Sequence, residues 1–120
     1  MTSDEALELP APAPISELEW NMAVTVMKES GAFASLRQSV ALQDAVVPLS
    51  DLALDQWRAI ISERIRNLPA FRIYMFGAGV VDKDRALTEI ANYSTVGQAL
   101  IEIEQNLVRN LHVRALNETT

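Results

Sequence analysis

Residues 69–81 read PAFRIYMFGAGVV, and the conformation of this stretch decides the fold class. Arg72 is its only charged residue, so the stretch is expected in a core or at an interface. It is too short to cross a bilayer as a helix. A strand here would need a partner, and no other segment gives a convincing strand pattern. The sequence therefore predicts a short helix, broken at Gly77 and Gly79.

The segment before it carries the clearest helical pattern in the chain. Five apolar residues recur at helical spacing and share one face. They are Leu54, Trp57, Ile61, Ile65 and Leu68. Ser50 or Asp51 is expected to cap this helix at its N-terminus. Pro69 ends it, because the proline ring removes an amide and crowds the preceding turn.

Two further helices are expected after residue 81. Asp82 and Asp84 are suited to cap a short helix that runs to about Asn92. After a turn at Tyr93 and Ser94, the motif Thr95-Val96-Gly97-Gln98 matches a capping box and opens a helix to about Ala115. Its main apolar stripe is Val96, Leu100, Ile103, Leu107 and Leu111.

The N-terminal half is less clear-cut. Ser16-Glu17-Leu18-Glu19 matches a capping box, which predicts a first helix from Ser16 to about Ser30, with Gly31 as its stop. The alternation of apolar residues over 20–27 also suits a strand, and the choice stays open. A second helix is expected over 32–43, followed by a loop that ends at Pro48.

These elements predict an all-α fold, a compact bundle of about five to six helices. Residues 15–116 form one helical domain on this interpretation. Residues 1–14 are expected to be a disordered, flexible tail, because they are acidic and end in a Pro/Ala alternation that holds neither a helix nor a ladder. Residues 117–120 are expected to fray.

The charge pattern bears on possible partners. The formal net charge is -6, yet the residues before position 20 carry acids and no base, so the rest of the chain is nearly neutral. A nucleic-acid partner is therefore disfavoured, since duplex binding needs a concentrated basic surface. No signal peptide and no membrane span is recognisable, which predicts a cytoplasmic protein.

The chain is poor in groups that perform catalysis. It has no cysteine, and His112 is its only histidine. Gly77-Ala78-Gly79 lacks the third glycine of a dinucleotide loop, because position 82 is Asp. The prediction is that the protein is not an enzyme and holds no cofactor and no metal. An enzymatic alternative would have to depend on Asp82, Asp84 or His112.

The function predicted from these observations is a non-catalytic helical protein-interaction module, an accessory subunit or small regulator of a larger assembly. Its partner is expected to be another protein or a second copy of the chain. The predicted partner-binding residues are Phe71, Arg72, Ile73, Tyr74, Met75 and Phe76. Whether residues 69–81 serve as core or as interface stays open.

The alternative is a DNA-associated transcriptional regulator that uses a helix-turn-helix-like pair over 85–109. The acids Glu102 and Glu104 speak against it, because they would lie where phosphates bind, and the second helix carries no base before Arg109.

Overall fold

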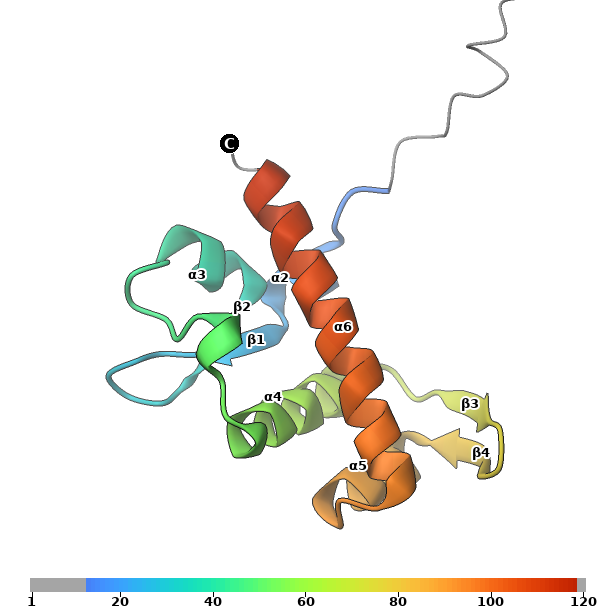
Figure 1. Cartoon of the computed structure of the whole chain (residues 1–120). Helices are drawn as coiled ribbons and strands as arrows, with labels where there is room; N and C mark the ends of the chain where they lie inside the picture. The colour runs from blue at the N-terminus through green and yellow to red at the C-terminus, as the bar shows by residue number, and fades with distance from the viewer. Residues whose placement is uncertain (1–12, 119–120) are drawn as a thin grey trace, which may run out of the picture.

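The computed structural model describes residues 13–118 and combines helices with two antiparallel hairpins (Figure 1). In chain order the elements are α2 (Glu17–Asn21), β1 (Ala23–Val26), β2 (Phe33–Ser35), α3 (Leu36–Ala41), the 3-10 helix η1 (Leu49–Asp51), α4 (Leu54–Asn67), β3 (Arg72–Met75), β4 (Gly79–Asp82), α5 (Lys83–Ala91) and α6 (Thr95–Glu118). The expected all-α bundle is therefore wrong. Most of the expected tail, residues 1–12, and residues 119–120 lie outside the described residues.

The first helix is much shorter than expected. Its capping box is confirmed, because the Ser16 hydroxyl accepts a hydrogen bond from the Glu19 amide at 3.2 Å. The helix nevertheless ends at Asn21, so the expected continuation to Ser30 is wrong. Residues 24–26 are all β-branched, which favours extended backbone over helix. The strand alternative is confirmed for the part of the chain that forms β1.

Strand β1 is buried on both faces. Val24 belongs to the main core, while Ala23 and Val26 pack with Ile60 of α4. The strand pairs with β2, which begins the segment for which a helix over 32–43 is expected. That helix is confirmed only as α3, which Ser35 caps by accepting from the Gln38 amide at 3.1 Å.

Helix α4 occupies the predicted segment and ends two residues before Pro69. Trp57, Ile61 and Ile65 of its predicted apolar face are buried. The predicted caps are wrong, because Ser50 and Asp51 both lie in η1 and the N-cap of α4 is Ala53. Instead, the Gln56 side chain accepts from the amide of Ala53 at 2.8 Å.

The helix predicted over 69–81 is wrong, and hairpin β3–β4 takes its place. Arg72 pairs with Asp82, and the register continues without a shift to Met75 and Gly79. Strand β3 pairs with β4, which lies within the same stretch of sequence. In Figure 1 this hairpin lies on one side of α6, while β1, β2 and α3 lie on the other side.

The two C-terminal helices begin close to where the sequence places them. Asp82 caps α5 by accepting from the Arg85 amide at 2.8 Å, as expected. For α6 the capping residue is Ser94 rather than Thr95, since Ser94 Oγ accepts from the Gly97 amide at 3.0 Å. The helix runs to Glu118, beyond the expected end at Ala115.

The main core forms where α4, α5 and α6 meet β1 and α3. Its largest fully buried side chains include Leu36, Ile61, Ile90 and Leu111. Gly97 allows α5 and α6 to approach closely, because a Cβ at this position would lie 2.1 Å from the carbonyl oxygen of Glu89. The predicted apolar stripe of α6 is only partly buried, because Ile103 and Leu107 are exposed.

Candidate interaction surface

The hairpin β3–β4 is closed by a tight turn that its glycines permit. The Ala78 amide donates to the carbonyl of Met75 at 3.0 Å, which closes the turn. Gly77 and Gly79 have φ values of 81° and 77°. Residues other than glycine rarely adopt this left-handed backbone conformation. The glycines that suggest a broken helix in the sequence are thus the turn of a hairpin.

The two faces of the hairpin have different surroundings. Residues directly opposite each other across an antiparallel pair share a face. One face carries Ile73, Met75 and Val81, of which Val81 is fully buried and Met75 packs against the main core. The other face carries Tyr74 and Val80, with exposed fractions of 77% and 56%. This outer face therefore presents apolar surface to solvent.

The tip of the hairpin is more exposed still. Phe76 has an exposed fraction of 101%, so its ring has no cover within the described residues. A large aromatic side chain that a fold leaves completely uncovered gains no stabilisation from burial. Together with Tyr74 and Val80, Phe76 makes up the surface that we call the hairpin patch.

Polar contacts tie the hairpin to the helices at its base. Arg85 of α5 donates through Nη1 to the carbonyls of Ala78 and Val80, at 2.7 and 2.9 Å. Lys83 donates through Nζ to the carbonyls of Arg66 and Leu68 at the end of α4, at 2.7 and 2.8 Å. The hairpin is therefore held at a fixed position relative to α4 and α5.

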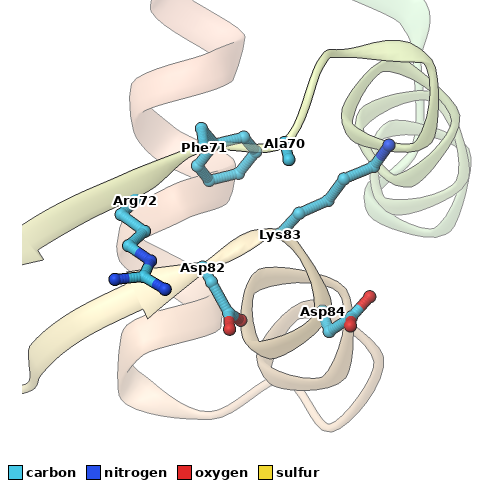
Figure 2. A pocket seen from close by; sticks show the side chains of 6 residues that line it. All are labelled: Ala70, Phe71, Arg72, Asp82, Lys83 and Asp84. Carbon is cyan, nitrogen blue, oxygen red and sulfur yellow. The ribbon is translucent and has the colours of Figure 1, made fainter.

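Figure 2 shows the polar hollow at the base of the hairpin, where β3 begins and β4 ends. The side chains of Arg72 and Asp82 lie on the same side of the two strands, while Lys83 points toward the end of α4. Both strand residues are exposed. They give the hairpin patch a charged margin that contains both signs.

An apolar groove of about 460 Å³ runs between the hairpin, the segment after α4 and helix α6. Its lining residues are Ile65, Leu68, Pro69, Ala70, Phe71, Ile73, Ala86, Leu100, Ile103 and Glu104. Ile103 is 56% exposed, and Leu107 lies one turn further along α6 and is also exposed. The groove therefore extends the apolar surface from the hairpin onto α6.

The six predicted partner-binding residues fall into two groups. Arg72, Ile73, Tyr74 and Phe76 are exposed, whereas Phe71 and Met75 are half-buried against the core. The stretch thus contributes to the core and to the surface at once. The six predicted residues do not include Val80 across the hairpin, which is also exposed, nor Ile103 and Leu107 in the apolar stripe of α6. One face of this last helix is the other interface that the sequence suggests.

Of the three residues on which an enzymatic alternative would depend, Asp82 and Asp84 line the same polar hollow, and His112 lies elsewhere. Asp82 serves as the cap of α5, and Asp84 is exposed in the first turn of that helix. His112 lines a separate hollow beside Thr25 and Val47, where burial lowers the pKa of its imidazole. Within residues 13–118, no group of three or more metal-ligating side chains comes together.

The helix pair over 85–109 exists as α5 and the first part of α6. Its base Arg109 packs on its own chain, since the guanidinium carbon lies 5.4 Å from the centre of the Trp57 ring. Glu102 is exposed on α6. These positions do not place a concentration of basic side chains on the helix pair, as duplex binding would need.

Comparisons of the chain with protein-family models, with curated proteins and with solved structures gave no match. Among the described helices, none combines the length and the apolar character that a membrane crossing requires.

Proposed function

We propose that this chain is a protein-interaction module, an accessory subunit or small regulator that acts through contact with another protein chain. Its binding surface is the hairpin patch, Tyr74, Phe76 and Val80, continued by the apolar groove beside α6. The observation that carries the proposal is the complete exposure of Phe76 at the tip of a hairpin that is anchored at its base.

The energetics of burial support this proposal. Covering a large apolar side chain stabilises a complex by about 1.5–3 kcal/mol relative to leaving it in water. The hairpin patch and Ile103 offer four such side chains on neighbouring elements. Aromatic side chains are enriched in the buried centres of protein interfaces, and charged residues gather at the rim. Arg72 and Asp82 have the position of such a rim.

The anchoring of the hairpin also favours binding. A surface that is already ordered loses less conformational entropy when a partner binds. The contacts of Arg85 and Lys83 hold the two strands against α5 and α4 before any partner arrives. The hairpin backbone that carries Tyr74 and Phe76 is therefore held in place before a partner binds.

The experiment is affinity capture of the tagged full chain from its native host, with identification of the proteins that copurify. The variants Phe76→Ser and Tyr74→Ser are compared with Val113→Ser, which removes an exposed apolar side chain on α6, away from the hairpin. We expect the two hairpin variants to lose a partner that the wild type and Val113→Ser retain. Equal recovery of every copurifying protein by all four chains would contradict the proposal.

A further inference from the structure

We infer that the partner at the hairpin is a second copy of this chain, which pairs its strand β3 with β3 along their outer edges. This inference rests on the proposed function, because the edge of β3 borders the hairpin patch and carries Tyr74. The two outer edges of the hairpin differ, because among the described residues the backbone of β4 is hydrogen-bonded there and that of β3 is not.

The outer edge of β4 is occupied. The carbonyls of Ala78 and Val80 both accept hydrogen bonds from Arg85 Nη1. Because the amide and the carbonyl of one strand residue point to the same side, the backbone groups of Val80 face away from β3. Tyr74 and Val80 therefore form a pair without cross-strand hydrogen bonds.

The outer edge of β3 is open. By the same alternation, Ile73 and Met75 bond across to β4, while the backbone groups of Arg72 and Tyr74 point outward. No other element in the described part of the chain bonds to these outward groups. Proteins usually protect such an edge with a proline, a bulge, charged side chains or a very short strand. Strand β3 is short and carries Arg72, but it has no proline and no bulge.

A second copy fits this edge without a conflict of charge. If two β3 strands pair antiparallel about a two-fold axis at Ile73, Arg72 of each copy lies opposite Tyr74 of the other. A guanidinium beside a tyrosine ring is a favourable cation–π pair. A register centred on Arg72 would place two guanidinium groups opposite each other, and one centred on Tyr74 would lose both Arg72–Tyr74 pairs.

The same register places the hairpin tip of one copy beside the groove of the other. Phe76 lies opposite Ala70 of the second copy, and Ala70 lines the groove. Aromatic side chains each bury about 150–250 Å². Covering Phe76 in this way would remove from water an apolar ring that the single chain leaves fully exposed.

The charge of the body permits such self-association. After residue 20 the chain has eleven acids against ten bases, so two copies bring little net charge together. A two-fold contact is also self-complementary, as this edge is, because each copy supplies the same donors and acceptors.

The first test measures the mass of the full chain by sedimentation equilibrium from micromolar to near-millimolar concentration. Tyr74→Pro removes an outward amide of β3 and leaves the bonds to β4 in place, since a proline is tolerated on an edge strand whose amide faces outward. Tyr74→Thr is the matched control, because it shortens the side chain and keeps the amide. Circular dichroism checks that both variants melt like the wild type.

We expect a wild-type dimer whose dissociation constant rises at least about tenfold in Tyr74→Pro and by less in Tyr74→Thr. In a mixture of isotope-labelled and unlabelled chains, we expect an intermolecular contact between the two Ile73 α-protons. A wild type that is monomeric at every concentration overturns this inference, and so does a dimer that Tyr74→Pro leaves intact. If affinity capture then still shows a partner that depends on Phe76, the proposed function stands while the second copy is replaced by a different protein.

Discussion

Arg64 and Glu104 form an ion pair that the fold almost completely encloses. Nε of Arg64 lies 3.3 Å from Oε2 of Glu104, and the exposed fractions of the two side chains are 3% and 18%. The same guanidinium donates through Nη1 to the carbonyl of Ala23 at 3.0 Å. One side chain of α4 thus connects α6 with β1.

Removing the acid from this pair should be costly. In Glu104→Ala the guanidinium of Arg64 stays buried without its counter-charge, so we expect the free energy of unfolding to fall by about 3 kcal/mol. Urea denaturation followed by circular dichroism measures it. The control is Glu17→Ala, which removes an exposed pair with Arg37 and should cost less than about 1 kcal/mol. Equal losses in the two variants would show that burial does not matter here.

Gly97→Ala should destabilise the protein by about 2 kcal/mol, because the added methyl group meets the carbonyl of Glu89 and forces α5 away from α6. In an open helix the same change would stabilise, since alanine has the higher helix propensity. Thermal and urea unfolding distinguish the two signs. Glu102→Ala, at an exposed position on the same helix, serves as the control and should change little. A stabilised Gly97→Ala would contradict the close approach.

The stability of the fold should depend on pH through His112. Burial lowers the pKa of this imidazole below its ordinary value, so the folded chain favours the neutral form. Between that lowered pKa and the ordinary pKa near 6.5, the unfolded chain binds more protons than the folded one. The contribution of His112 is therefore complete above the ordinary value and is lost as the pH falls through this window.

Urea denaturation at a series of pH values from about 7.5 to about 5.5 checks this dependence around the ordinary histidine pKa. We expect the free energy of unfolding of the wild type to decrease over this range more than that of His112→Gln. Parallel curves for the two chains would exclude His112 as the group responsible.

Arg85→Ala should loosen the hairpin. The variant loses the two hydrogen bonds to the carbonyls of Ala78 and Val80, which we expect to cost about 1 kcal/mol because the side chain is partly exposed. Amide hydrogen exchange should accelerate at residues 73, 75, 79 and 81 more than in α4. Arg85→Lys is a useful comparison, since both bonds come from the single nitrogen Nη1 and an ammonium group also has several donors, so we expect a smaller effect than in Arg85→Ala. Unchanged exchange in the hairpin would contradict the anchoring role.

The helices were the predictable part of the fold, because their signals are local. The apolar face of α4 repeats over four turns and ends before Pro69. Asp82 lies directly before α5 and caps it, as expected from sequence. Ser94 was missed as the cap of α6 because Thr95 next to it carries the same kind of hydroxyl group.

The strands could not be predicted in the same way, because alternation of polar and apolar residues fails when both faces of a strand are apolar. All four residues of β1 are buried. In β3 and β4 the outer face carries Tyr74 and Val80 beside Arg72 and Asp82, so the polar half of the pattern is incomplete in both strands. The partner strand was also missed, since the two strands are joined by only three residues, Phe76 to Ala78.

The candidate surface was predictable only within one stretch of sequence. Residues 71–76, in which Arg72 is the only charged residue, were predicted to bind a partner, and the exposed ring of Phe76 lies among them. Ile103 and Leu107 fit a buried helical stripe equally well, but the fold leaves them exposed. A contact that is set by tertiary packing leaves no local signal.

Site-specific photo-crosslinking in the native host measures directly whether another chain binds at the hairpin tip. A photoreactive phenylalanine analogue replaces Phe76 in one chain and Val113 in a control chain. We expect a discrete crosslinked protein, either a second copy or another chain, from position 76 and none from position 113. A chain that crosslinks at position 113 but gives no product at position 76 would contradict binding at the hairpin tip.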